Sequence, residues 1–150
     1  MSTNGIGVIE DLVETLEDGA AGFEKLADLL DDDTAGDVGT EMRRFAEERK
    51  RFSAELRELA AGRGEEIKES GSVGGAAHRA WMKIKDTVTG DDPHAALAAA
   101  EEGEDHSVQE FEDALSSDLP ADIRDVVARQ AVAVRQAHDK VRALRDSYAS

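Results

Sequence analysis

Three ionisable side chains of this sequence could do chemistry, because they fall where helical patterns call for apolar residues. Arg49 lies on a stripe that recurs at steps of three and four residues, Glu104 lies on a second stripe, and His138 lies at the edge of a third. A guanidinium that faces a core must find an anionic partner, since an unpaired buried charge is very costly. Carboxylates and imidazoles are also common metal ligands in proteins. These positions therefore raise two possibilities, a buried ion pair and a metal site.

The elements that would position these side chains are long amphipathic helices. The apolar periodicity predicts four of them, at about residues 6–30, 37–61, 93–115 and 120–148. The joints within the first pair and within the last pair are short, so each pair should be antiparallel. The long middle connection holds a Gly/Ser-rich bend and a short helix within about residues 72–88, and it could travel the length of the bundle. We therefore predict an all-α, antiparallel four-helix bundle with one long crossover, the ferritin-like arrangement.

Composition limits the classes of function. The chain has 150 residues, enough for one domain, and contains no cysteine. A formal net charge of −16 argues against nucleic-acid binding. The acidic faces could simply keep the protein soluble, or they could collect cations. No segment is apolar enough to span a membrane, and the N-terminus lacks the layout of a signal peptide, so we expect a cytoplasmic protein.

Several short motifs stand out beside the helical patterning, and helical patterning alone would not generate one of them. The most specific is Ser72-Val73-Gly74-Gly75 followed by His78-Arg79-Ala80-Trp81-Met82. The others are Asp18-Gly19 with Gly22-Phe23, Glu48-Arg49 with Phe52, Gly103-Glu104-Asp105, Asp118-Leu119-Pro120 and His138-Asp139. Together they resemble the bacterial ferritin-like four-helix-bundle proteins of unknown function over nearly the full chain. The resemblance implies a ferritin-like bundle and brings no established activity.

The resemblance also implies where a metal centre would lie. Di-metal ferritin-like sites place inward carboxylates on all four helices, with Glu-x-x-His pairs on two of them. Compared with rubrerythrin-like sequences, Arg49 stands at the position of a ligand Glu, and Phe52 stands at the position of the His. Carboxylates remain on other helices at Glu104 and at Glu17 or Asp18. His138 remains on the last helix, although Arg135 replaces its Glu.

A cation at the position of a bridging carboxylate repels a metal, so we expect no metal cofactor. We predict that Arg49 pairs with Glu104, and that Glu17, Asp18 or Gln130 could join them. Two alternatives remain open. One is an ordinary di-iron centre, for which Glu17, Asp18, Glu104 and His138 are the candidate ligands. The other is a single divalent metal bound at the edge of the bundle by His138 and a carboxylate.

Two functions are compatible with these residues. The first is a non-catalytic, stress-associated bundle protein that acts through self-association or contacts with other proteins. A homodimer face could come from Gly19 and Gly22 of the first helix, or from the connector, where Trp81, His78 and Arg79 are candidates for interaction or simply for packing. The second is a divergent ferritin-like metal-binding protein, oxidase or peroxidase that uses iron or another divalent metal. We expect no hydrolase-type catalysis, because the sequence offers no set of nucleophile, base and orienting residue.

Overall fold

The computed structural model describes residues 6–31, 37–64 and 93–147. Within these ranges the chain forms helices and no strand, which confirms the prediction of an all-α protein with four long helices. They are α1 (Ile6–Asp31), α2 (Asp37–Gly62), α4 (Pro93–Ser116) and α5 (Ala121–Ser147). The predicted bounds differ from these by at most one residue. The predicted connector helix, with His78, Arg79 and Trp81, lies outside the described residues.

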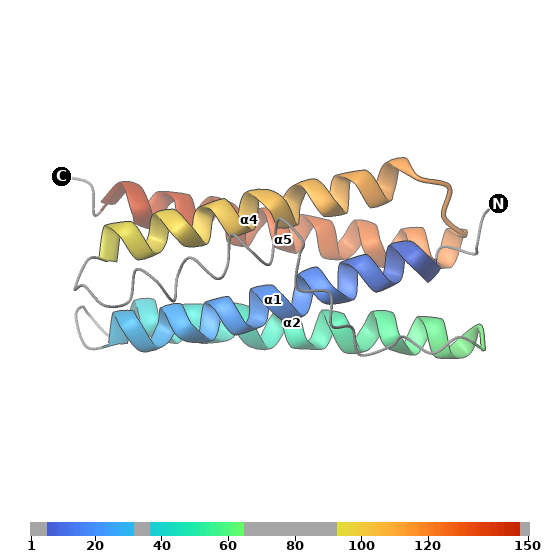
Figure 1. Cartoon of the computed structure of the whole chain (residues 1–150), viewed down its shortest axis with the longest axis horizontal. Helices are drawn as coiled ribbons and strands as arrows, with labels where there is room; N and C mark the ends of the chain where they lie inside the picture. The colour runs from blue at the N-terminus through green and yellow to red at the C-terminus, as the bar shows by residue number, and fades with distance from the viewer. Residues whose placement is uncertain (1–5, 32–36, 65–92, 148–150) are drawn as a thin grey trace.

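Ion pairs between the helices give their relative directions. In three pairs of neighbouring helices, residue numbers rise on one helix as they fall on the other. The pairs are Arg43–Asp28 and Arg57–Glu17 between α1 and α2, Lys140–Glu41 and Arg63–Asp122 between α2 and α5, and Arg145–Glu101 and Arg135–Glu112 between α4 and α5. It follows that α2 and α4 run in one direction and α1 and α5 in the other, as Figure 1 shows. Helix α1 packs against α2 and α4, and α5 packs against the same two helices.

The apolar core is divided into two clusters along the bundle. One cluster includes Phe23, Leu26, Met42, Leu97 and Val141. The other includes Leu12, Leu16, Leu56, Phe111 and Val127. On α2 the first cluster ends at Ala46 and the second begins at Phe52, and the fully buried Arg49 lies between them. Glu104 takes the corresponding place on α4, so a layer of charge interrupts the core at the middle of the molecule.

Helix α1 presents small residues at the height of this layer. Its buried residues between Leu16 and Phe23 are Gly19, Ala20 and Gly22. Both glycines are buried within the chain, so they do not form the exposed homodimer face that we considered for them.

Hydrogen bonds close two of the helix ends in the described part of the chain. Two residues beyond the end of α2, Gly64 has a φ of 78° and donates its backbone N–H to the carbonyl oxygen of Ala61 over 2.9 Å. At the joint between α4 and α5, the guanidinium of Arg124 donates to the carbonyl oxygens of Leu115 and Ser117, each over 2.8 Å. These bonds satisfy carbonyls that the end of a helix leaves without partners. None of the described helices has the length and apolar character that crossing a bilayer requires.

Candidate functional site

The centre of the bundle holds a two-point ion pair between α2 and α4. Arg49 Nη1 donates to Glu104 Oε2 over 2.8 Å, and Arg49 Nη2 donates to Glu104 Oε1 over 2.6 Å. Both side chains are fully buried, with 0% of their surface exposed. This parallel pairing is the strongest form of contact between a guanidinium and a carboxylate. The structure therefore brings together the two residues whose pairing the sequence led us to expect.

The face of an aromatic ring completes the surroundings of the guanidinium. Arg49 Cζ lies 5.1 Å from the centroid of the Phe23 ring, which is within the range of a cation–π interaction. The Phe23 ring in turn contacts the Phe45 ring, with centroids 5.3 Å apart and planes inclined by 54°. The Nε atom of Arg49 has no hydrogen-bond partner among the described residues. The guanidinium group of Arg49 is thus contacted by a carboxylate on one side and by an aromatic face on another.

The other residues expected near this pair take different partners. Glu17 Oε2 accepts hydrogen bonds from Ser53 Oγ over 2.9 Å and from Arg57 Nη2 over 2.8 Å. Gln130 Nε2 donates to Glu55 Oε1 over 2.9 Å and more weakly to the backbone oxygen of Phe52. In the described part of the chain, neither Glu17 nor Gln130 is hydrogen-bonded to Arg49 or Glu104. The carboxylate of Glu17 instead lies near the surface, where it links α1 to α2.

A second cluster of ionisable groups lies beside the buried pair, at the edge between α4 and α5. His138 Nε2 is 2.6 Å from Asp105 Oδ1, and His138 Nδ1 is 3.1 Å from Asp139 Oδ1. Glu101 lies one helical turn before Asp105 and is itself buried. One ligand atom from each of Glu101, Asp105 and His138 lies within 4.8 Å of the other two. Of these three, only His138 was singled out from the sequence.

The position of Glu101 and Asp105 could have been noticed from their spacing. They are four residues apart on one helix, so they share a face, and Glu104 lies one residue before Asp105. What the sequence does not show is which residue of α5 faces them, because that depends on the register of two helices. In the structure Arg145 pairs with Glu101, and Arg142 Nε lies 3.8 Å from the same carboxylate.

The environment of His138 favours its protonated form. Burial of the ring lowers the pKa of His138, but hydrogen bonds with Asp139 and Asp105 raise it, and so do the negative charges of Asp105 and Glu104. The pKa of His138 therefore lies above its usual value of 6.5. At neutral pH this shift increases the fraction of the imidazolium, which both neighbouring carboxylates stabilise.

Crowded carboxylates occur on another part of the surface, between α1 and α4. Burial and nearby negative charge raise the pKa of Asp11 on α1 and of Glu110 on α4, each above its ordinary value. The charged side chains that act on these two groups are Glu10, Glu14, Asp113 and His106. Only His106 opposes the increase. This surface is therefore electrostatically unfavourable at neutral pH, because like charges are held close together.

These three groups predict that the chain becomes more stable as the pH falls from mildly alkaline to mildly acidic values. A group whose pKa is raised by folding binds more protons in the folded state between its two pKa values, so the free energy of unfolding falls as the pH rises through that window. The window of His138 begins at 6.5, and those of Asp11 and Glu110 begin at 3.8 and 4.5. Glu55 has a lowered pKa and acts in the opposite direction, but only below 4.5.

Melting temperatures recorded by circular dichroism across this pH range would test the prediction. The His138→Gln variant should lose the part of the pH dependence that lies above pH 6.5. The Asp11→Asn variant should lose some of the pH dependence of the melting temperature at more acidic pH. A wild-type melting temperature that rises from about pH 6 to 8 would contradict the assignment.

Fold and site together define a four-helix-bundle protein whose interior carries a paired charge in place of a continuous apolar core. Residues 5–117 match the model of a family described as a domain of unknown function (DUF2383). This match covers most of the chain, and the chain therefore belongs to that family. No curated protein matches the sequence.

Proposed function

We propose that this chain is a non-catalytic, ferritin-like bundle protein that acts in stress through self-association. The observation that carries the non-catalytic part is the two-point pair of Arg49 with Glu104. Both oxygens of the Glu104 carboxylate already accept hydrogen bonds from the guanidinium. A positive charge at this position would also repel a metal cation. The residues at the middle of the bundle thus do not fit a centre with two metal ions.

The directions of the helices support the ferritin-like part of the proposal. In the ferritin-like arrangement one long crossover joins two parallel helices, and neighbouring helices are antiparallel. Helices α2 and α4 run in the same direction, and they are consecutive among the described helices. The end of α2 and the start of α4 therefore lie at opposite ends of the bundle (Figure 1). On this proposal residues 65–92 form the long crossover.

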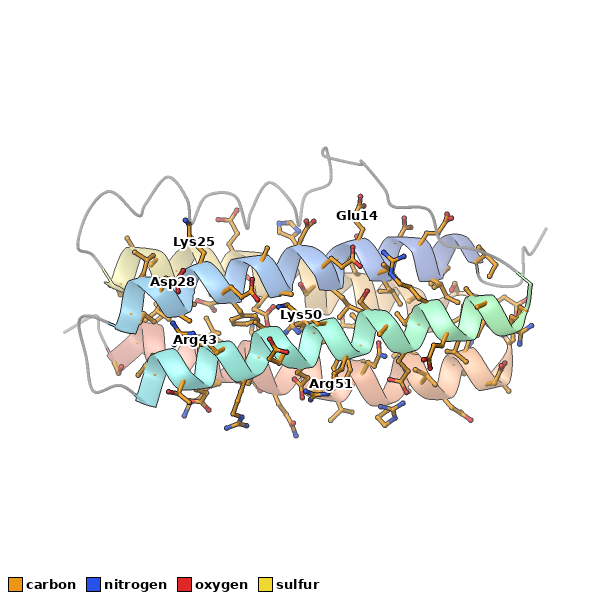
Figure 2. The ribbon with its side chains drawn as sticks, turned by 90° about the horizontal axis from the view of Figure 1, so that it is seen from below. Glu14, Lys25, Asp28, Arg43, Lys50 and Arg51 are labelled. Atoms are coloured by element: carbon orange, nitrogen blue, oxygen red, sulfur yellow. The ribbon has the colours of Figure 1, made fainter. Side chains whose placement is uncertain are left out.

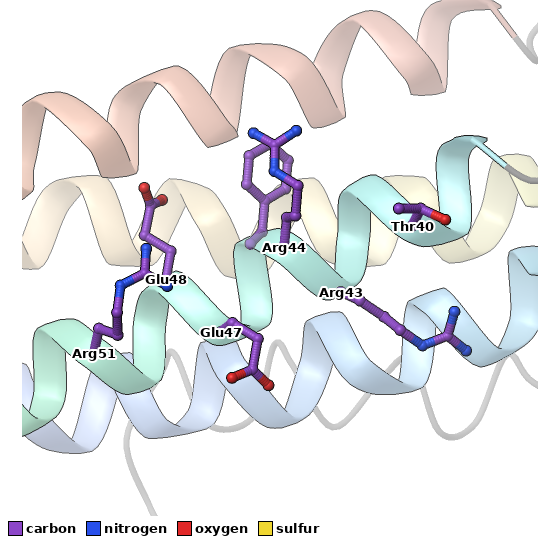
Figure 3. A pocket seen from close by; sticks show the side chains of 7 residues that line it. Thr40, Arg43, Arg44, Glu47, Glu48 and Arg51 are labelled. Atoms are coloured by element: carbon purple, nitrogen blue, oxygen red, sulfur yellow. The ribbon is translucent and has the colours of Figure 1, made fainter.

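The outer face of α2 offers a surface for self-association. Arg44 and Arg51, with Glu48 between them, share one face of the helix (Figure 3), and Phe45 lines the same groove. These residues line an open groove of about 340 Å³. Its size is at the lower end for a small-molecule site and its lining is mostly charged, which suits side chains of a protein better than an apolar ligand. Both arginines are exposed, and neither makes an ion pair among the described residues.

Charge complementarity supports a second copy of the chain as the partner on this groove. The protein carries a net charge of −16, and the carboxylates around Asp11 and Glu110 repel one another. The exposed guanidinium groups of Arg44 and Arg51 on a neighbouring copy would relieve that repulsion. Figure 2 shows Glu14 and Arg51 on opposite sides of the α1–α2 pair. The contact would therefore join two different faces, which is a heterologous association.

We predict that Arg51→Glu abolishes this association. Wild-type protein should form dimers or larger species at about 10 mM salt and dissociate as salt approaches about 0.5 M, because screening weakens contacts between exposed charges. The Arg51→Glu variant should stay monomeric at low salt. Light scattering coupled to size exclusion, over a range of protein concentrations, measures both effects.

A matched control for this experiment is Lys25→Glu. Lys25 is also an exposed cation, and it lies on α1, away from the groove (Figure 2). The substitution changes the net charge by the same amount, so it should leave the association largely intact. If the wild-type protein remains monomeric at low salt and high protein concentration, self-association is ruled out as the function. Equal loss in both variants would remove the α2 groove as the surface.

A further inference from the structure

At the edge between α4 and α5, one side chain with a nitrogen ligand atom and two with oxygen ligand atoms lie close together. The proposed self-association uses none of these three side chains. Glu101 and Asp105 stand one turn apart on α4, and His138 faces them from α5. In the Glu101–Asp105–His138 set, one candidate ligand atom of each residue lies within 4.8 Å of the others. Two ligands of one transition-metal ion, each at about 2.0–2.2 Å, lie roughly 3–3.5 Å apart. Small side-chain rotations would bring the three atoms to that spacing.

We propose that Glu101, Asp105 and His138 bind one divalent first-row transition-metal ion, of the size and chemistry of Zn²⁺. An imidazole with two carboxylates is a common ligand type for such ions, whereas Mg²⁺ and Ca²⁺ prefer oxygen ligands alone. The site is mononuclear and lies at the edge of the bundle. It makes no use of Glu104, whose two oxygens are both occupied by Arg49.

The hydrogen bond behind the histidine supports this assignment. His138 Nδ1 lies 3.1 Å from Asp139 Oδ1, so Nδ1–H can donate to that carboxylate. In the metal-free chain Nε2 carries a proton towards Asp105 Oδ1, 2.6 Å away, and loss of that proton frees the Nε2 lone pair for a metal ion. Histidines that bind metals usually have such a carboxylate on their second nitrogen, because it fixes the tautomer and the orientation of the ring. Without a metal, a proton on Nε2 can fill the same place between His138 and Asp105.

The mobility of each ligand is suited to capturing an ion. Asp105 has a side chain that is 62% exposed, so it can rotate away from Nε2 and admit a cation between the two residues. Glu101 is 11% exposed at its side chain and is held by Arg145, which orients its carboxylate. The Oε2 atom of Glu101 lies 3.8 Å from Arg142 Nε, beyond hydrogen-bond distance, and that oxygen can turn to a metal. Two ligands are thus fixed by neighbours, and the third closes the site from the surface.

Titration calorimetry of the full, untagged chain with Zn²⁺, at about pH 7.5 and with excess Mg²⁺ present, tests the proposal. The Mg²⁺ occupies the many exposed carboxylates that bind cations without selectivity. We expect one Zn²⁺ per chain. The Asp105→Asn variant should bind at least about tenfold more weakly, and His138→Gln should show no saturable binding under these conditions. Asp139→Asn should weaken binding by about 10–100-fold, the range for a group that orients a metal-binding histidine.

The matched control is Asp113→Asn, which removes an exposed carboxylate from α4 two turns beyond Asp105. Its affinity for Zn²⁺ should equal that of the wild type. Asp105 is exposed, so Asp105→Asn keeps the test valid even if His138→Gln fails to fold. Replacing Zn²⁺ by Co²⁺ gives a second readout, because d–d absorption bands report a nitrogen and oxygen ligand set directly. Wild-type binding that is unsaturable, or that Asp105→Asn and Asp113→Asn reduce equally, would overturn the site.

Discussion

Replacing Glu104 by alanine is expected to destabilise the folded chain by about 3–5 kcal/mol, the cost of leaving one member of a buried ion pair without its partner. The reason lies in the chemistry of arginine. Its guanidinium stays charged at any accessible pH, so Arg49 cannot respond by losing a proton. Arg49 is fully buried at the middle of α2, and its other close contact is the uncharged face of Phe23. A cation would therefore remain in the core with neither a carboxylate nor water to stabilise it.

This loss should be easy to measure. For a chain of this length, a change of 1 kcal/mol shifts the melting temperature by about 2–4 °C, so the expected decrease is roughly 6–20 °C. Urea unfolding followed by circular dichroism would give the free energy directly. The comparison should be made in metal-free buffer, so that any ion bound beside His138 does not contribute.

The double variant Arg49→Met with Glu104→Leu is the control that isolates the charge. Replacing a complete buried ion pair by apolar side chains is often neutral, or stabilising by about 1–4 kcal/mol. We therefore expect the double variant to be far more stable than Glu104→Ala, even though it changes more atoms. If the two variants are equally unstable, the loss of stability in Glu104→Ala comes from packing and not from an uncompensated charge.

Replacing Phe23 by alanine is expected to cost about 3–5 kcal/mol, the range for large-to-small substitutions of a buried phenylalanine. Phe23 is fully buried, and its ring joins three features of the core. It fills the apolar cluster next to the charge layer, it contacts the Phe45 ring, and it lies against the guanidinium of Arg49. A desolvated cation–π contact adds about 2 kcal/mol or more, so we expect a value near the upper end of the range.

The Phe23→Leu variant separates the cation–π contact from the loss of volume. Leucine keeps most of the apolar volume and removes the aromatic face. Exchanges of this kind usually lower the free energy of unfolding by less than about 1.5 kcal/mol, so a larger decrease is expected only if Arg49 depends on the ring. Combining Phe23→Leu with Arg49→Met in a double-mutant cycle measures the coupling. A coupling energy near zero would mean that the two side chains are merely adjacent.

Taken together, these two residues explain how a charge is tolerated at the centre of the bundle. Glu104 supplies the opposite charge with two hydrogen bonds, and Phe23 supplies an aromatic face. An ion pair of this kind adds little net stability over an apolar core, but it penalises any alignment of the helices that separates its members. We expect the register of α2 against α4 to depend on it.

The sequence by itself determined the four helices, because hydrophobic periodicity and helix-ending residues are local properties. The glycines after α2 and the Asp-Leu-Pro joint before α5 gave bounds that differ from those of the structure by at most one residue. The inward positions of Arg49 and Glu104 were also readable, since each falls on an apolar stripe of its own helix. Their pairing could be expected because a buried cation needs an anion and the inward carboxylates were few.

Only the tertiary structure decided which side chains meet across helices. Glu17 was a candidate for the central pair, yet it bonds to Ser53 and Arg57 near the surface, because the rotation of α1 turns it outwards. Glu101 and Asp105 gained their significance from the register of α4 against α5, which places His138 opposite them. The buried state of Gly19 and Gly22 likewise depends on neighbouring helices. Hydrophobic periodicity specifies the face of a helix on which a residue lies. The residue that it contacts on another helix depends on how the two helices rotate and slide against one another. The packing of the whole core sets that rotation and register.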